Sequence, residues 1–542
     1  GQDVLGIMPT GAGKSACFQI PALLKGGITL VVSPLISLMK DQVMALIAAG
    51  VPAAYINSSL SPAQCSLALR RASAGHYKLV YIAPERLLTA TFLHFAKNTA
   101  ISLVAVDEAH CVSQWGQDFR PSYLNIPQFI EALPHRPPVA AFTATATIQV
   151  KDDIIRLLRL KSPCQRVTGF DRDNLRFLRY KPKDKDKAVL DLLAQRPNAC
   201  AIIYCATRKS VDGVCDFLRQ NGYAATRYHA GMEENLRRES QDDFQYDRAR
   251  IMVATNAFGM GIDKSNVQLV IHYHMPKNLE SYYQEAGRAG RDGTPADCIL
   301  LYAKRDAALA RYMIERSDSN PDMSFQERAR LMEIELERLK QMTFYATISR
   351  CLRQSILRYF GEKSGSYCGN CSVCLGMTEQ LASPGMKQPE IKAALTLQEQ
   401  RFAGLRALRN QIARGSGLPA YTVFSDATLR EMALVMPRTA EEMLKISGIG
   451  KHKLAQYGEL FLGYLRKLEM LAVGEDGLDI TSLMALAQSH WEGKAKWPSD
   501  ELSTLKAEIS LGLNVSAIAA LHERTPESIK EMMIELGLRP RF

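Results

Sequence analysis

A phosphate-binding loop is predicted near the start of the chain. Residues 8–15 read Met-Pro-Thr-Gly-Ala-Gly-Lys-Ser and follow the apolar run Val4–Ile7. This is a P-loop pattern in which Met8 replaces the first glycine. Its backbone N–H groups, together with the positive end of a helix expected near Lys14, would face a phosphate. We expect Lys14 to reach the β and γ phosphates and Ser15 to ligate Mg²⁺. The expected nucleotide-binding residues of this loop are Thr10, Gly11, Ala12, Gly13, Lys14 and Ser15.

Two adjacent carboxylates are candidates for the chemical step. Residues 107–110 read Asp-Glu-Ala-His, directly after the apolar run Leu103–Val106. At a strand end near the P-loop, Asp107 can hold Mg²⁺ through water, and Glu108 can orient or deprotonate an attacking water. The alternative is an acidic turn after a strand, and the P-loop on the same lobe favours the catalytic interpretation.

Two arginines form a third candidate. Residues 284–291 read Gln-Glu-Ala-Gly-Arg-Ala-Gly-Arg. We expect a helix that opens near Ser281 to place Arg288 and Arg291 on one face. Across a cleft from the P-loop, they could stabilise charge on a transferred phosphoryl group. Taken alone, these residues favour a solvated basic helix.

Four of the twelve cysteines form a cluster with metal-ligand spacing. They are Cys351, Cys368, Cys371 and Cys374, with the pattern C-x16-C-x2-C-x2-C. Four thiolates suit tetrahedral Zn²⁺, and the absence of an open ligand position predicts a structural site. A [4Fe–4S] cluster is the chemical alternative. The other eight cysteines are scattered, which is typical of buried thiols in a reducing compartment.

The elements that must position these residues are predicted by short apolar runs alternating with amphipathic stretches. Such runs are typical of parallel strands covered on both faces, and they occur as two sets along the first 300 residues. The fold class is therefore α/β, with two tandem parallel-sheet lobes followed by smaller all-helical regions. The expected strands are Thr29–Ser33, Leu79–Ile82, Leu103–Val106, Ala140–Thr143, Ala201–Cys205, Ile251–Ala254 and Leu269–His272.

Composition shifts predict the remaining organisation. The charged segment Asp184–Lys187 is interpreted as part of the boundary region between the lobes. The expected divisions are lobes at 1–168 and 169–303, a helical cysteine-containing region at 304–377, a linker at 378–396, a helical unit at 397–472, a second linker at 473–500 and a helical tail at 501–542.

The overall composition points to a nucleic-acid partner. Hydrophobic residues make up 47% and charged residues 23% of 542 residues, which is ordinary for globular proteins. The net charge of +11 favours a polyanion. The sequence holds neither a membrane-spanning apolar run nor a signal-peptide pattern, so a cytoplasmic protein with no membrane partner is expected.

These motifs, in this order, resemble superfamily 2 helicases, and their flanking residues narrow the resemblance to the RecQ family. The resemblance covers 1–375 and recurs in 398–468. The residues that carry it are 8–15, 33–42, 107–116, 142–147, 253–264 and 284–293.

The resemblance implies a fold of two RecA-like lobes with a RecQ zinc-binding subdomain, and roles for further residues. Thr143 and Thr145 would couple the ATP site to DNA, and Gly261 and Asp263 would add to the nucleotide cleft. His110, Gln284, Arg288 and Arg291 join Lys14, Asp107 and Glu108 as catalytic residues, with Arg291 the preferred arginine finger. Trp115, Phe119 and Arg120 would form an aromatic-rich loop that senses single-stranded DNA through stacking and charge.

The sequence departs from the family pattern at three places. Gln117 stands where the family usually has His in the aromatic-rich loop. The chain begins almost at the P-loop, so we expect a truncation that removes the glutamine-containing segment which reads adenine. Only about twenty residues separate Cys374 from Leu397, too few for the usual winged-helix domain.

The C-terminal third resembles known DNA-binding modules. Phe402–Leu468 resembles the helicase-and-RNase-D C-terminal (HRDC) domain, in which Lys451 and Lys453 beside a Gly-Ile-Gly turn would contact phosphate. A structural bundle that binds protein is the alternative. Residues 515–536 resemble a helix-turn-helix, although the acidic side chains of Glu527, Glu531 and Glu535 favour an ordinary hairpin equally well.

Together these observations predict an ATP-, Mg²⁺- and Zn²⁺-dependent 3′ to 5′ DNA helicase. We expect a bacterial, nucleoid-associated monomer that acts on single-stranded and tailed or branched DNA in repair, recombination and the SOS response. Single-strand-binding protein is a further expected partner. One alternative is a translocase or annealing factor that unwinds weakly, and another is a zinc-stabilised DNA-binding protein.

Overall fold

The protein is described by a computed structural model that covers residues 1–116, 118–197, 199–258, 264–316, 324–377, 379, 397–416, 420–471 and 533. The chain divides into two compact units, which are considered separately. The first contains residues 1–244 and 249–386, and the second contains 245–248 and 387–542. Among the described residues, no helix is long and apolar enough to span a membrane.

The first lobe is built on a seven-stranded sheet in which every strand pair is parallel. The strand order is β3-β4-β2-β5-β6-β1-β7. Because β5, β6 and β1 are neighbours, the loops that follow their carboxyl ends meet at one edge of the sheet. The strands are β1 Val4–Ile7, β2 Ile28–Val32, β3 Ala53–Ile56, β4 Leu79–Ile82, β5 Ile101–Val106, β6 Val139–Thr143 and β7 Cys164–Val167.

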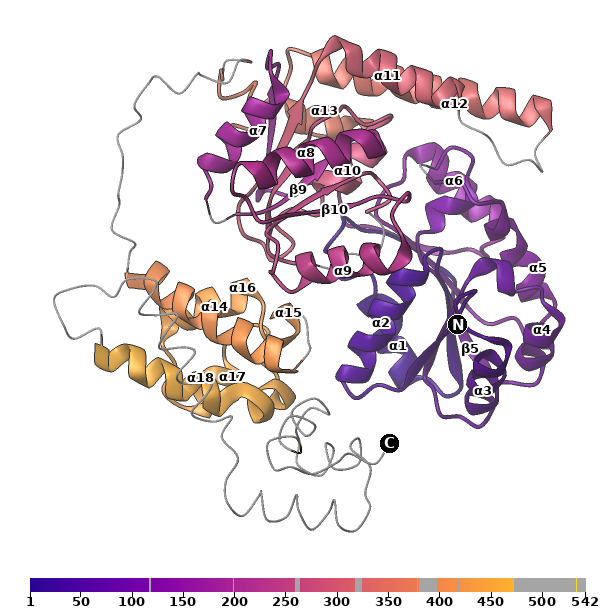
Figure 1. Ribbon diagram of the computed structural model, residues 1–542. Helices are drawn as coiled ribbons and strands as arrows, with labels where there is room; N and C mark the ends of the chain where they lie inside the picture. The colour runs from indigo at the N-terminus through magenta and orange to yellow at the C-terminus, as the bar shows by residue number, and fades with distance from the viewer. Residues whose placement is uncertain are drawn as a thin grey trace. The chain divides into compact units, whose positions relative to one another are not determined.

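Helices cover both faces of this sheet (Figure 1). Helices α1 and α2 pack on one face, and α3, α4, α5 and α6 on the other. Because helices cover both faces, these strands are buried along their whole length and are mostly apolar. The helices are α1 Ala16–Leu24, α2 Ile36–Ala48, α3 Pro62–Ser73, α4 Ala90–Lys97, α5 Ile126–Glu131 and α6 Ile148–Leu157, with short 3₁₀ helices η1 Pro84–Arg86, η2 Ala109–Val112 and η3 Pro121–Asn125.

The second lobe repeats this plan with a six-stranded parallel sheet in the order β10-β11-β9-β12-β13-β8. Helices α7 and α8 pack on one face, and α9 and α10 lie on the other. The strands are β8 Leu175–Tyr180, β9 Cys200–Tyr204, β10 Ala225–Tyr228, β11 Ile251–Ala254, β12 Val267–His272 and β13 Ala296–Leu301. The helices are α7 Lys185–Ala194, α8 Arg208–Gln220, α9 Glu234–Gln245 and α10 Leu279–Ala286.

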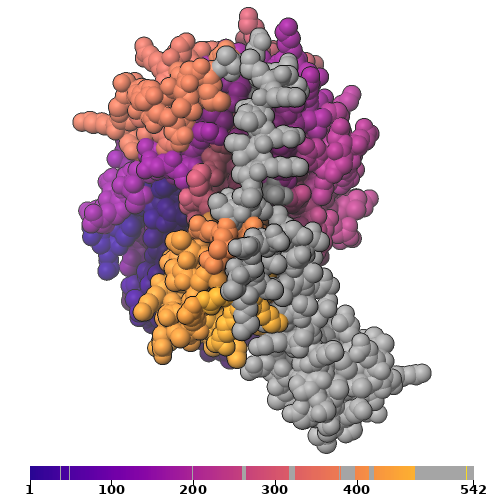
Figure 2. Space-filling view, turned by 90° about the vertical axis from the view of Figure 1, so that its left-hand side faces the viewer, coloured from indigo at the N-terminus to yellow at the C-terminus, as the bar shows by residue number. Residues whose placement is uncertain are grey.

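A helical region completes the first unit. It consists of α11 Lys304–Glu315, α12 Phe325–Thr347 and α13 Leu352–Tyr359. Ser324 and Glu327 form a capping box that starts α12. In the space-filling view this region, in salmon, lies directly against the sheet-containing part of the unit (Figure 2).

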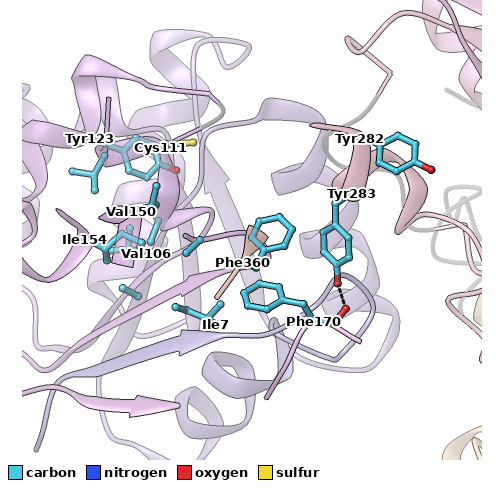
Figure 3. Packing of buried hydrophobic residues seen from close by; sticks show 14 of the residues in the cluster. Ile7, Val106, Cys111, Tyr123, Val150, Ile154, Phe170, Tyr282, Tyr283 and Phe360 are labelled. Carbon is cyan, nitrogen blue, oxygen red and sulfur yellow. Dashed lines mark hydrogen bonds between the residues drawn. The ribbon is translucent and has the colours of Figure 1, made fainter. Parts of the chain in front are cut away.

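An aromatic joint ties the helical region to the segment that connects the lobes (Figure 3). The rings of Phe170 and Phe360 stack with centroids 4.6 Å apart, and Tyr283 of α10 lies 5.1 Å from Phe360. The Tyr283 hydroxyl donates to the Phe170 carbonyl oxygen over 2.6 Å. This joint therefore packs the lobe junction, α10 and the end of α13 together.

The second unit is all-helical around its own core. Its described helices are α14 Leu397–Ser416, α15 Ala420–Val423, α16 Asp426–Val435, α17 Ala440–Leu444 and α18 Lys451–Leu471. The core is centred on buried apolar residues such as Leu408, Phe424 and Phe461. Inside it, the buried Arg409 guanidinium pairs with the buried Asp426 carboxylate.

The predicted parallel-sheet fold and all seven predicted strands are confirmed, with several bounds shifted by one or two residues. Six strands that were not among those predicted are also present: β1, which is the apolar run Val4–Ile7 before the P-loop, and β3, β7, β8, β10 and β13. Edge strand β7 is mostly exposed, and two arginines interrupt the apolar residues of β8, so neither strand shows a continuous apolar run. The interpretation of Asp184 as part of a boundary region is wrong, because its side chain caps α7 inside the second lobe.

Candidate functional site

The P-loop joins the end of β1 to the start of α1. Gly11 and Gly13 adopt φ values of 86° and 80°, which L side chains rarely take. A Cβ atom at Gly11 would lie 3.5 Å from Cγ of Arg291, so the second lobe closes against this loop. The Thr10 hydroxyl is buried and has no hydrogen-bond partner among the described residues. These features fit a loop whose N–H groups and hydroxyl are arranged for a phosphate-bearing ligand.

Lys14 and Ser15 are held by neighbouring groups. The Lys14 ammonium donates to the carbonyl oxygens of Met8 and Pro9, over 3.3 and 3.5 Å. Burial lowers the pKa of Lys14, and the carboxylates of Glu108 and Asp107 oppose that shift. The Gln42 amide donates to the Ser15 hydroxyl over 3.1 Å. Gln42 lies in the 33–42 segment that carries the family resemblance, but the sequence alone predicted no role for it.

Asp107 follows β5, and its main-chain N–H donates to the Val32 carbonyl oxygen. Burial and the neighbouring Glu108 charge raise the pKa of Asp107 to about 7, against the opposing effect of Lys14. Burial also acts to raise the pKa of Glu108, but His110, Lys14 and Arg288 hold it at about 2. Of the two carboxyls, Glu108 is therefore the stronger acid, and it is ionised at neutral pH.

A chain of polar contacts links Glu108 to the end of β6. The Glu108 carboxylate lies 3.3 Å from Nδ1 of His110, and the same nitrogen lies 2.8 Å from the Thr143 hydroxyl. Thr143 in turn donates to the Thr145 carbonyl oxygen. The Thr143 carbonyl oxygen accepts from the Met8 N–H, which begins the P-loop. The structure thus brings His110, Thr143 and Thr145 together with the nucleotide loop.

The prediction that Arg288 and Arg291 share one face of a helix is wrong. Helix α10 ends at Ala286, so Arg288 and Arg291 lie in the turns that follow it, not on a helical face. The turn at Gly290, with a φ of 55°, ends regular structure there. Both arginines still reach the site, because Arg288 acts on the charge of Glu108 and Arg291 lies against the P-loop. Gln284, on α10 itself, is half-buried.

Arg172 fixes these turns and was missed by sequence reasoning. Its guanidinium donates to the carbonyl oxygens of Gly287, Ala289 and Gly290 over 2.6, 2.9 and 2.5 Å. Arg353 of α13 in turn donates to the Arg172 carbonyl oxygen. The only signal in the sequence was a polar cluster, Asp-Arg-Asp-Asn at 171–174, near the expected lobe boundary.

The aromatic-rich loop lies in the first lobe. Trp115 is half-buried against the main core, and Phe119 is half-buried as well. Arg120 pairs with Asp118 over 3.0 Å and donates to the Pro34 carbonyl oxygen over 2.7 Å. Arg120 is therefore engaged within the lobe in this state. Gln117, Gly261 and Asp263 lie outside the described residues.

The four clustered cysteines converge as a metal site requires. Their sulfur atoms all lie within 4.8 Å of one another, although they come from two segments of the chain. Main-chain N–H groups of Leu352, Asn370 and Cys374 point at the sulfurs of Cys371, Cys368 and Cys371, each over 3.4 Å. Such donors stabilise thiolates, so the site fits Zn²⁺ with no position left open.

The second unit presents the two lysines differently. Lys451 is exposed at the start of α18. The Lys453 ammonium lies over the Phe424 ring, 5.8 Å from its centroid, and burial lowers its pKa. Lys451 is thus the better placed of the two for a phosphate. The predicted helix-turn-helix at 515–536 lies outside the described residues, apart from the isolated Met533.

Comparison with protein families gives four matches along the chain. Residues 1–154 match the DEAD/DEAH box helicase family, and residues 184–293 match the helicase conserved C-terminal domain. Residues 304–375 match the RecQ zinc-binding family, and residues 398–465 match the HRDC domain.

Individual proteins agree with these matches. The chain is 38% identical to the ATP-dependent DNA helicase RecQ of Bacillus subtilis, over 85% of this chain and 93% of that protein. It is 36% identical to the protein of the same name in Pasteurella multocida, over 86% of this chain and 89% of that protein. With a nucleotide loop, paired carboxylates, closing arginines and a Cys₄ site in one unit, the chain belongs to the RecQ family of ATP-hydrolysing DNA helicases.

Proposed function

We propose that this RecQ-family enzyme moves 3′ to 5′ along single-stranded DNA and unwinds tailed or branched duplexes in DNA repair and recombination. The observation that carries the proposal is the path from Glu108 through His110 to Thr143 and Thr145. This path joins the candidate catalytic carboxylate to the two threonines at the end of β6 that are expected to couple the ATP site to DNA. Such a path allows a structural change at one end to be transmitted to the other end.

The proposed roles follow from the geometry. Lys14 and the P-loop N–H groups bind the phosphates, while Ser15 and Asp107 hold Mg²⁺. Bound ATP supplies the phosphoanhydride that is cleaved. Glu108 orients the attacking water and accepts its proton, since its carboxylate remains ionised at neutral pH. Arg288 and Arg291 stabilise charge that develops on the transferred phosphoryl group, and Gln284, Gly261 and Asp263 complete the cleft.

We further propose that the enzyme works as a monomer with single-strand-binding protein nearby, at the bacterial nucleoid and within the SOS response. The support is that the matched Bacillus and Pasteurella relatives are bacterial DNA helicases. Trp115, Phe119 and Arg120 would contact the unpaired strand, and Lys451, helped by Lys453, would contact its phosphates.

Strand separation and ATP turnover on one 3′-tailed and one 5′-tailed duplex test this proposal. We expect turnover with both tails, separation only with the 3′ tail, and loss of both signals in Glu108→Ala. The exposed Glu131→Gln substitution serves as the control and should leave both signals unchanged. Separation of the 5′-tailed duplex alone would contradict the polarity.

One observation favours a second candidate, a translocase or annealing factor that separates strands weakly. The alignment with the Bacillus protein runs over 556 positions but includes 85% of this 542-residue chain, which is about 460 residues. About 95 positions of that alignment therefore hold no residue of this chain, an amount comparable to a small domain. DNA-stimulated turnover without strand separation on either duplex would select this candidate.

A further inference from the structure

A buried arginine on α12 contacts both lobes. Arg338 lies on the buried face of the helix, between Ile334 and Met342, and its side chain is 9% exposed. Placing a guanidinium within an apolar stripe is costly unless its charge and donors are satisfied. Its partners therefore indicate why arginine stands at this position.

The first partner lies in the aromatic-rich loop of the first lobe. The Arg338 guanidinium donates to the Gly116 carbonyl oxygen over 3.2 Å, directly after Trp115. Gly116 packs tightly against the Asp107–His110 motif, because a Cβ atom at Gly116 would lie 2.0 Å from the His110 carbonyl oxygen. A displacement of this loop must therefore move Arg338, His110 or both.

The second partner lies on α10 of the second lobe. Nε of Arg338 lies 3.8 Å from Oε1 of Glu280, which is in the first turn of α10 and only 4% exposed. The Tyr359 hydroxyl of α13 donates to the same oxygen over 2.7 Å. The other end of α10 leads into the turns that carry Arg288 and Arg291, so Glu280 and these arginines are joined by one short helix.

This network is only partly satisfied in the present state. Nη2 of Arg338 and Oε2 of Glu280 are both buried and have no hydrogen-bond partner among the residues described. Buried charged groups with unused donors and acceptors are costly and rare. Since one unused donor and one unused acceptor belong to an adjacent pair, a small shift could bring them into a two-bond, bidentate contact.

We propose that Arg338 is the positioning residue that transmits strand binding at the aromatic-rich loop to the arginine-bearing turns of the second lobe. When the loop moves on a bound strand, the Gly116 contact is released and Arg338 closes onto Glu280 in a bidentate pair. That closure draws α10, and with it Arg288 and Arg291, toward the nucleotide. The inference rests on the proposed role of Trp115 and its loop in sensing single-stranded DNA.

ATP turnover with and without saturating single-stranded DNA, together with strand affinity measured by fluorescence anisotropy, tests the inference. We expect the DNA-stimulated ATPase rate of Arg338→Met to fall by about tenfold or more, because Arg288 and Arg291 no longer respond to movement of the aromatic-rich loop. Its turnover without DNA and its strand affinity should stay within about twofold of the unsubstituted protein. Arg338→Lys, which keeps the charge but loses the forked geometry, should recover part of the stimulation.

Matched variants separate this role from simple packing. Lys340→Met removes a cation from the exposed side of the same helix and should change nothing. Glu280→Gln keeps the size of its side chain and should reproduce the loss of stimulation, which keeps the test decisive if Arg338→Met fails to fold. Combining Arg338→Met with Trp115→Ala should lower the stimulated rate no further than the more severe single change.

A spectroscopic readout tests whether the loop still senses DNA. With Trp491 and Trp497 replaced by Phe, Trp115 is the only tryptophan in the sequence. In Arg338→Met, we expect the strand-induced change in Trp115 emission to persist while the stimulated ATPase rate is lost. Full stimulation in both Arg338→Met and Glu280→Gln, or a parallel fall in basal rate, affinity and melting temperature, would overturn the inference. If the unsubstituted protein shows no DNA stimulation, the proposed function itself fails.

Discussion

Glu108 stands in a conformation that few residues adopt. Its φ of 46° and ψ of 48° lie in the left-handed region, which costs about 1–3 kcal/mol for a residue with a side chain. The conformation turns the chain directly after β5, so that the carboxylate meets His110 and the main-chain N–H meets the Asp107 carboxylate over 3.0 Å. The surrounding β5–η2 turn and the P-loop hold this strained residue in place.

The ionised state of Glu108 leads to a prediction about Glu108→Gln. The amide keeps the size of the side chain but cannot accept a proton, so ATP turnover should fall by about 10²–10⁴-fold. Binding of a fluorescent ATP analogue should change little, because Lys14 and the P-loop remain. Steady-state turnover and equilibrium titration measure the two quantities separately. A residual rate above one tenth would assign the proton to another group.

At the scale of elements, the buried pair in the second unit makes a separate prediction. Asp426→Asn leaves the Arg409 guanidinium, which is 2% exposed, without its counter-charge. Removing one partner of a buried pair costs about 3–5 kcal/mol, and we expect this loss in the opening free energy of α14 and α16. Amide hydrogen exchange in the full chain measures it. Arg438→Met, which breaks an exposed pair with Glu469, should cost less than about 1 kcal/mol.

The same pair predicts acid sensitivity in this unit. Burial acts to raise the pKa of Asp426, but the charges of Arg409 and Arg406 outweigh it and hold that pKa below its ordinary 3.8. The unfolded chain therefore binds the proton more readily than the folded one. The pair's stabilisation is fully present above pH 3.8 and is lost as the pH falls through the folded pKa. An acid titration of helical signal, with Asp426→Asn as the comparison, checks the sign.

The cysteine site ties α13 to the loop that follows it, so its metal should stabilise the whole helical region. Cys371→Ser removes a fully buried ligand. We expect the zinc content to fall from one ion per chain to near zero, together with a lower melting temperature. Metal analysis and thermal unfolding measure these changes. Cys65→Ser, at a half-buried cysteine outside the cluster, should keep both unchanged.

At the scale of the whole molecule, the first and second units each have their own core, so they can be separated. A chain that ends at residue 377 should keep its ATP turnover without DNA. It should bind single strands more weakly, because the Lys451 region no longer adds a phosphate contact. Each lost contact reduces the slope of log affinity against log salt by about 0.7 for single strands. An unchanged slope would mean that the helical unit binds protein instead of DNA.

The sequence by itself determined the local chemistry. The P-loop glycines and the paired carboxylates could be recognised because each depends on neighbours within a few residues. Three of the four clustered cysteines also fall within seven residues, and Cys351 lies 17 positions before them. The buried strands could be recognised for the same reason, since a strand covered on both faces is a nearly continuous apolar run. The family resemblance used the same local signals.

Only the tertiary structure decided which distant groups meet. Gln42 on Ser15, Arg172 on the turns after α10, and Arg338 between Gly116 and Glu280 are contacts between residues far apart in the chain. Each of these side chains is an ordinary polar residue in its own sequence window. Strand order at one edge of a sheet and the packing of α12 against both lobes select their partners, and neither leaves a periodic signal in the sequence.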